Sequence, residues 1–207
     1  MSYRARRRPG RSDETRERIT VAVRELLAEG AFHESTVEQV ADRAGIARAT
    51  LYGHFRSRAD LVDAICETFD ANPALLELRR IVELPDADTA LARTISNTIR
   101  FWSSEDAVLR QLYGVAAVDE AARDLVDRQR ADRRGELERL VRNLRRNDRL
   151  RRGMTERRAV SLLLVLTNYE TYRELREAGH SDRQATTLLQ EAAADLLLPP
   201  PRWTRSG

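Results

Sequence analysis

The sequence of 207 residues contains one cysteine and no lysine, and it has few aromatic residues. The single cysteine, Cys66, excludes an internal disulfide framework and a thiolate metal cage. Aromatic residues make up only 5%, and no segment keeps a strict apolar–polar alternation, so β-strands are not expected. Because disulfides belong to oxidising compartments, a reduced, cytoplasmic setting is expected. Within it we expect Cys66 to be a buried apolar residue rather than a redox sensor.

Long apolar runs are absent as well. The longest one, Leu162–Leu166, falls far short of the roughly 20 residues that cross a bilayer, so no membrane partner is expected. No apolar segment follows the basic N-terminus, so no secretory signal is predicted. The three histidines, His33, His54 and His180, show no metal-ligand spacing. No nucleophile elbow, phosphate loop or carboxylate pair appears, so we expect no metal, no cofactor and no enzyme.

The positive charge is concentrated at the N-terminus. All 36 basic residues are arginine, against 33 acidic residues, and residues 1–60 hold 12 of the arginines against 9 acidic side chains. Five of these lie in the first eleven residues: Arg4, Arg6, Arg7, Arg8 and Arg11. Residues 12–60 therefore carry seven arginines against nine acidic residues, a net charge of −2. We interpret residues 1–11 as a disordered arm, which either lies along nucleic acid or stays solvated.

Between this arm and the proline-rich tail at 199–207, helical periodicity predicts an all-α fold. Capping residues and glycines mark the helix ends in the first part, and longer apolar stripes mark the second part. The predicted helices start near Ser12, at Thr36, at Arg48 and at Ser57, then cover about 88–103, 108–112 and 119–147, and start again after Thr155 and at Ser181.

Two of these predicted helices are short and separated by a glycine-containing turn. Residues 36–44, the turn Gly45-Ile46-Ala47 and residues 48–54 have the spacing of a helix-turn-helix. Small Ala41 and Ala44 allow the helices to cross closely.

Leu51 is expected to bury the inner side of the second helix, which turns Arg48, Ala49, Tyr52 and Gly53 outwards. An outward arginine on a short helix can enter a major groove and pair with guanine O6 and N7. By spacing alone, three ordinary helices of a bundle remain the alternative.

The segment over residues 36–61, TVEQVADRAGIARATLYGHFRSRADL, resembles the DNA-binding domain of the TetR family of bacterial transcriptional regulators. The resemblance covers about residues 12–66 and is most specific in Thr50-Leu-Tyr-Gly-His-Phe55, followed by Ser57, Arg58 and Leu61.

The resemblance implies roles for matching residues. Leu51 and Phe55 correspond to core positions of the family. Positions that approach bases or adjacent backbone are Arg48, Ala49, Thr50 and Gly53. Positions that contact phosphate are Thr36, Tyr52, His54 and Arg58, and the arm adds Arg4, Arg6, Arg7, Arg8 and Arg11.

Two positions depart from the family pattern. Ala47 replaces a frequent serine cap, which forgoes about 1 kcal/mol of capping. Gly53 lies inside the recognition helix, where glycine costs roughly 1 kcal/mol relative to alanine. This glycine either allows close approach to DNA or is simply tolerated. Base readout is then expected to rest mainly on Arg48, supported by Thr50 and Ala49.

For the remaining helices, the resemblance implies a small-molecule pocket and a four-helix bundle formed with a second subunit. Candidate pocket residues are Phe101, Trp102, Tyr113, Asn168, Tyr169 and Tyr172. Candidate interface residues are Leu188, Leu189, Leu196 and Leu197, with the apolar run at 162–166 nearby. The alternative for both sets is ordinary intramolecular core.

The sequence thus predicts an arm at 1–11, a helix-turn-helix domain at 12–56, an effector-binding and dimerisation domain at 57–198, and a tail at 199–207. We expect a homodimeric regulator, more specifically a repressor, that binds a double-stranded DNA operator and is released by an unknown small-molecule effector. One alternative is a helical ligand-binding or scaffold protein whose basic arm binds RNA or membranes nonspecifically. The other is an all-α enzyme, for which no catalytic constellation is visible.

Overall fold

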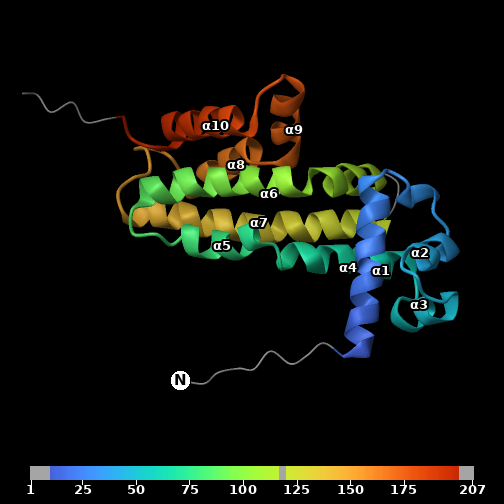
Figure 1. Ribbon diagram of the computed structural model, residues 1–207. Coiled ribbons are helices and arrows are strands. Elements are labelled where there is room, and N and C mark those ends of the chain that lie inside the picture. The colour runs from blue at the N-terminus through green and yellow to red at the C-terminus, as the bar shows by residue number, and fades with distance from the viewer. Residues whose placement is uncertain (1–9, 117–119, 201–207) are drawn as a thin grey trace, which may run out of the picture. The chain divides into compact units, whose positions relative to one another are not determined.

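The computed structural model describes residues 10–116 and 120–200, and every regular element in these ranges is a helix (Figure 1). The predicted all-α fold is confirmed. In chain order the elements are α1 (Arg11–Ala28), η1 (Phe32–Glu34), α2 (Val37–Arg43), α3 (Arg48–His54), α4 (Arg58–Asp70), α5 (Pro73–Ile81), α6 (Ala87–Ala116), α7 (Glu120–Arg146), α8 (Glu156–Leu166), α9 (Tyr169–Glu177) and α10 (Asp182–Leu197).

The described residues form two compact units. The first comprises the chain up to Phe69 together with Ala107–Val126, and the second comprises Asp70–Asp106 and the chain from Asp127 onward. Helices α6 and α7 contribute to both units. Within the described ranges, no helix combines the length and apolar content needed to cross a membrane.

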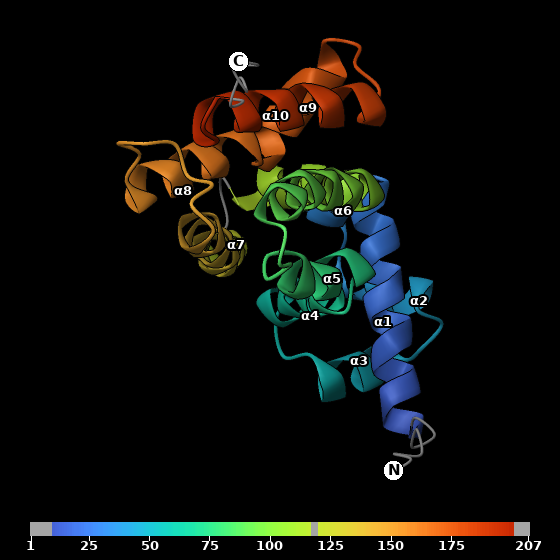
Figure 2. The same cartoon turned by 90° about the vertical axis from the view of Figure 1, so that its left-hand side faces the viewer.

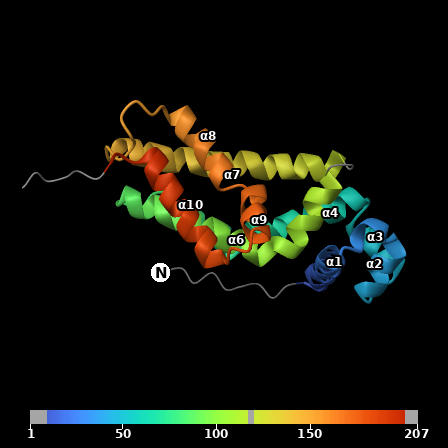
Figure 3. The same ribbon diagram turned by 90° about the horizontal axis from the view of Figure 1, so that it is seen from above.

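The first unit is built on α1, against which α2 packs, and α3 packs against α2 (Figure 3). Its apolar face repeats at helical spacing through Ile19, Val23 and Leu27, each at most 1% exposed. Arg24 of α1 donates to the hydroxyl of Thr68 on α4 at 2.8 Å, which ties α1 to the fourth helix. The result is a helical platform that carries α2 and α3.

In the second unit, polar side chains join helices that are distant in sequence. The Asn143 amide of α7 donates to the carbonyls of Val82 and Leu84, at 2.9 and 2.8 Å, at the end of α5. Gln190 of α10 donates to the carbonyl of Ala92 on α6 at 2.8 Å. Helices α8, α9 and α10 gather on one side of this unit (Figure 2).

Several predicted helix starts are confirmed by their caps. The hydroxyls of Thr155 and Ser181 accept hydrogen bonds from the backbone N–H groups of Arg158 and Gln184, at 3.2 and 3.3 Å. Helix α1 begins at Arg11, one residue before the predicted start, with Gly10 as its N-cap.

Other predictions were wrong. Residues 88–112 were split into two helices, whereas α6 is continuous. The polar residues between the two predicted helices do not break it, and the Ser104 hydroxyl donates to the carbonyl of Phe101 at 3.0 Å within the helix. Helices α5 and α9 were not predicted. Asn72 caps α5 directly before Pro73, a local start signal that the sequence contains. Asn168 caps α9 only two residues after α8 ends.

Candidate nucleic-acid interface

The entry to α2 is fixed by the capping box that the sequence predicts. The Thr36 hydroxyl accepts from the backbone N–H of Gln39 at 3.2 Å, and the Gln39 side chain accepts from the backbone N–H of Thr36 at 2.8 Å. Thr36 is exposed at this helix start. A hydroxyl keeps its own hydrogen for donation while it accepts such a bond, as a phosphate contact requires.

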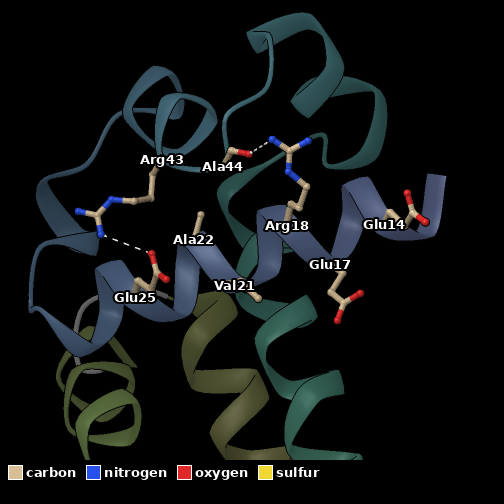
Figure 4. Close-up of a pocket in the computed structure, with 8 residues that line it drawn as sticks. All are labelled: Glu14, Glu17, Arg18, Val21, Ala22, Glu25, Arg43 and Ala44. Atoms are coloured by element: carbon tan, nitrogen blue, oxygen red, sulfur yellow. Dashed lines mark hydrogen bonds and ion pairs between the residues drawn. The ribbon is translucent and has the colours of Figure 1, made fainter. Parts of the chain in front are cut away.

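The turn between α2 and α3 depends on Gly45 and on a residue of α1. Gly45 has a φ of 63°, a left-handed conformation that favours glycine. The guanidinium of Arg18 donates to the carbonyls of Ala44 and Gly45, both at 2.7 Å, and Figure 4 shows its reach to Ala44. Sequence reasoning missed Arg18, since no local pattern links it to a turn 26 residues away.

Beneath α3 lies an apolar core, as predicted. Leu51 and Phe55 are each 1% exposed, and Val40 and Ala41 of α2, the helix that α3 contacts, are likewise buried. Helix α3 spans Arg48–His54, the range predicted for it, and Ala47 makes no side-chain cap. The exposed residues of α3 are Arg48, Ala49, Thr50, Tyr52 and Gly53.

Arg48 is engaged by two neighbours on this exposed surface. Its Nη1 forms an ion pair with the carboxylate of Glu38 on α2. Its guanidinium carbon lies 5.5 Å from the ring centroid of Tyr52, one turn further along α3. A hydrogen bond with Tyr52 and then the charge of Glu38 raise the pKa of Arg48 above its ordinary value. The pairing with Glu38 was not predicted from the sequence.

Arg58, a predicted phosphate contact, binds backbone carbonyls in the free chain. Its side chain reaches from α4 to the segment before α2, where it donates to the carbonyls of Phe32 and, at 3.1 Å, Ser35. The guanidinium carbon also lies 4.0 Å from the ring centroid of Phe32. Arg58 is therefore half-buried and joins α4 to the entry of α2.

The remaining predicted contacts of α3 lie at its C-terminal end. His54 is half-buried, and its ring lies beside that of Phe55, with centroids 6.5 Å apart. At Gly53, an added Cβ would meet no heavy atom within 4 Å. The fold of this chain alone therefore leaves room for a side chain at position 53.

A shallow groove of about 470 Å³ runs along α1 on another side of the unit (Figure 4). It is lined by Glu14, Glu17, Arg18, Val21, Ala22, Glu25, Arg43 and Ala44. Three carboxylates on this groove oppose the approach of a phosphate backbone. The exposed face of α3 is thus the better candidate for nucleic acid within the described part of this unit.

The predicted arm is only partly visible. Arg4, Arg6, Arg7 and Arg8 lie outside the described residues. Arg11 is described, and it is the exposed first residue of α1.

The helix-turn-helix geometry agrees with comparisons to known proteins. Residues 19–65 match the profile of the family described as bacterial regulatory proteins, tetR family. The matched residues include the whole of α2, the Gly45 turn and α3. Residues 19–65 are thus similar to the DNA-binding domain of the tetR family.

Curated relatives match this chain over 55 to 91 residues. The HTH-type transcriptional activator FasR of Mycolicibacterium smegmatis is 33% identical over 55 residues, which make up 27% of this chain and 25% of that protein. The chain aligns to less than half the length of each of the curated relatives that it matches.

Solved structures share the fold over most of the chain. The SmeT–triclosan complex has a TM-score of 0.73 at 21% identity and covers 89% of this chain and 91% of that chain. A protein from Saccharomonospora viridis in complex with choline has a TM-score of 0.73 at 18% identity, over 89% of this chain and 98% of that chain. At such identities the likeness concerns the fold.

Four of the aromatic residues predicted for the effector pocket form one cluster in the second unit. Phe101, Trp102, Tyr169 and Tyr172 are each at most 5% exposed. Successive ring centroids lie 5.0, 5.6 and 6.3 Å apart. Tyr113 belongs to the first unit, and Asn168 caps α9 through a 2.6 Å bond to the N–H of Thr171.

The polar tips of this cluster are bound within the unit. The Trp102 indole donates to the carbonyl of Thr167 at 3.1 Å, and the Tyr169 hydroxyl donates to the carboxylate of Asp106 at 2.6 Å. The Tyr172 hydroxyl lies 3.2 Å from the carboxylate of Asp182, and burial raises the pKa of this phenol. The same hydrogen bonds and ring contacts also fit the alternative, in which the cluster is ordinary intramolecular core and not a ligand pocket.

The residues predicted for the subunit interface divide into two groups. Leu189 and Leu197 are 4% and 0% exposed and belong to the core of the second unit. Leu188 and Leu196, two turns apart on α10, are 43% and 38% exposed, and Val165 of α8 is 62% exposed. Exposed apolar side chains therefore lie on both α8 and α10, helices that also contact each other.

The structure also bears on the single cysteine and on metal binding. Cys66 is buried on α4, as expected for a small apolar residue. Among residues 10–116 and 120–200, no group of three or more His, Cys, Asp or Glu side chains is placed to hold a metal ion.

Proposed function

We propose that this chain is a TetR-family, sequence-specific DNA-binding transcriptional regulator of the cytoplasm, and more specifically a repressor released by a small-molecule effector. In this proposal residues 12–56 bind DNA and residues 57–198 bind the effector and a second subunit. The arm at 1–11 adds phosphate contacts, and the tail at 199–207 has no assigned role. The exposed face of α3 on its buried core is the observation that carries the proposal.

That face offers two kinds of contact. Arg48, Ala49, Thr50 and Gly53 approach base edges, and arginine is the side chain best suited to guanine. The phosphate contacts come from Thr36, Tyr52, His54 and Arg58 and from the arm residues Arg4, Arg6, Arg7, Arg8 and Arg11. Two copies of α3 in a dimer would enter successive major grooves about 34–36 Å apart, which implies a pseudo-palindromic operator.

Selection from random-sequence duplex tests this function. The wild-type chain is expected to enrich a two-fold symmetric site and to bind it at least about 1,000-fold more tightly than a scrambled duplex of the same composition. Equal binding to both duplexes would instead favour a scaffold whose basic arm meets nucleic acid nonspecifically. Release of the enriched duplex by members of a compound library then tests the effector.

An effector is proposed because related structures hold small molecules. SmeT is bound to triclosan, and the Saccharomonospora viridis protein is bound to choline. Driving a two-state population from 99:1 to its reverse takes about 5.5 kcal/mol of differential affinity. Triclosan and choline are therefore the first probes to test for release of the enriched duplex.

Homodimerisation through α8 and α10 has its own test. We expect Leu188→Glu to raise the dimer dissociation constant at least about 100-fold, because a two-fold interface loses the burial of two leucines. Sedimentation of the 23.7 kDa chain measures the change from dimer to monomer. Leu76→Glu on α5 is the matched control, since Leu76 is 51% exposed outside this surface. A Leu188→Glu chain that remains dimeric would place the interface elsewhere.

The two interpretations of Gly53 are separable by one substitution. We expect Gly53→Ala to stabilise the free chain by up to about 1 kcal/mol, because alanine favours a helix and a Cβ meets no neighbour there. Urea denaturation measures this gain. Operator affinity then distinguishes the roles: a tolerated glycine leaves it unchanged, whereas close approach of DNA backbone lowers it about tenfold or more.

A further inference from the structure

Three exposed side chains form a connected set on the helix-turn-helix. Glu38 lies near the start of α2, Arg48 is the first residue of α3, and Tyr52 follows one turn later. The Glu38 carboxylate pairs with Arg48, whose guanidinium stacks on the Tyr52 ring. The side chains of Arg48 and Glu38 are 60% and 47% exposed, so all contacts lie on the surface proposed to meet DNA.

This pairing changes what Arg48 offers to nucleic acid. A free guanidinium binds any phosphate and adds affinity that does not depend on sequence. The carboxylate of Glu38 neutralises the charge and repels nearby phosphate. A guanidinium has five N–H donors in a planar fork. It can therefore keep its Nη1 bond to Glu38 while two other donors face guanine O6 and N7.

We propose that Glu38 is a specificity-determining residue, which holds Arg48 against Tyr52 in position for guanine and weakens its attraction to phosphates of other sequences. This inference rests on the proposed function, since it assumes that α3 reads bases. Glu38 acts through Arg48 as a positioning residue. Its main effect is to weaken binding to non-operator DNA. Weaker binding of competitors is one of the two ways to obtain specificity, and stronger binding of the correct partner is the other.

The test uses Glu38→Gln, which removes the charge and keeps the size of the side chain. Dissociation constants are measured by fluorescence anisotropy over a range of salt concentrations. The probes are the duplex enriched by the wild-type chain and its scrambled version. We expect tighter binding of the scrambled duplex, with a salt slope steeper by about one to two for a dimer. The preference for the enriched duplex should fall on the order of tenfold.

Two comparisons separate this role from a general charge effect. Glu17→Gln makes the same charge change on α1, and it should alter both affinities together and leave the preference unchanged. In an Arg48→Ala background, Glu38→Gln should cause no further loss of preference. Circular dichroism of each variant checks that the helices are retained.

The possible outcomes are distinct. An unchanged preference in Glu38→Gln overturns the inference, and so does an equal loss of preference with and without Arg48. If the wild-type chain itself does not distinguish the two duplexes, the proposed function fails, and the inference fails with it. A loss of preference that requires Arg48 supports both.

Discussion

The Arg48→Ala variant is expected to lose most of its preference for the operator, whereas its affinity for unrelated duplex falls only modestly. One bidentate contact to guanine accounts for roughly 10- to 100-fold discrimination, and a dimer makes two such contacts. Arg48 contacts the exposed side chains of Glu38 and Tyr52, so the fold should persist without it. Competition between enriched and scrambled duplex measures the change directly.

Arg43→Ala is the matched control for this prediction. Arg43 is an arginine of the same helix pair, but its guanidinium binds the carboxylate of Glu29 on α1, at 2.8 and 2.9 Å. Its loss should leave the preference for the operator unchanged. Arg48→Lys keeps the charge without the planar fork and should behave almost like Arg48→Ala. Undiminished preference in Arg48→Ala would show that base reading lies with other residues.

The Gly45→Ala substitution should destabilise the helix-turn-helix unit by about 2–4 kcal/mol. At a φ of 63° a Cβ is strained by itself, and the new atom would lie 2.8 Å from Nη2 of Arg18. Arg18 must then move away from the carbonyls of Ala44 and Gly45. Urea denaturation gives the loss as a lower midpoint, and operator binding should fall with it.

Gly30→Ala separates the two causes of this loss. Gly30 lies in the same unit and has a φ of 74°, but an added Cβ would meet only the flexible end of Gln111, at 3.3 Å. It should therefore cost only the backbone strain of about 1–2 kcal/mol. In an Arg18→Ala background, the excess cost of Gly45→Ala should disappear. Equal losses for Gly45→Ala and Gly30→Ala would show that the Arg18 contact contributes no stability.

Local signals predicted much of the first unit. The capping box at Thr36, the turn at Gly45 and the apolar spacing of Leu51 and Phe55 act within a few residues of each other, so they can be read from the sequence. The same holds for the caps at Thr155 and Ser181. Helix α5 was equally readable, because Asn72 followed by Pro73 is a local start signal.

Contacts that depend on tertiary packing could not be predicted. Arg18 and Arg58 bind carbonyls 23 to 27 residues away. The pairing of Glu38 with Arg48 exists only because the turn brings two helix starts together. The sequence also cannot distinguish a buried aromatic residue that lines a ligand pocket from one that belongs to the packed core. The indole N–H of Trp102 and the hydroxyl of Tyr169 are both hydrogen-bonded within the protein, which is compatible with a pocket and with a core.

The two arginines that bind backbone carbonyls have a consequence for regulation. Arg58 of α4 attaches the segment that enters α2, and Arg18 of α1 attaches the segment that leaves it. Helix α2, with α3 joined to it by four residues, is thus fastened at both ends to neighbouring helices. Under the proposed function, a signal that reaches this domain would therefore have to move α3 together with α1, α2 and α4. In the proposed dimer, control would then act through the distance between the two recognition helices.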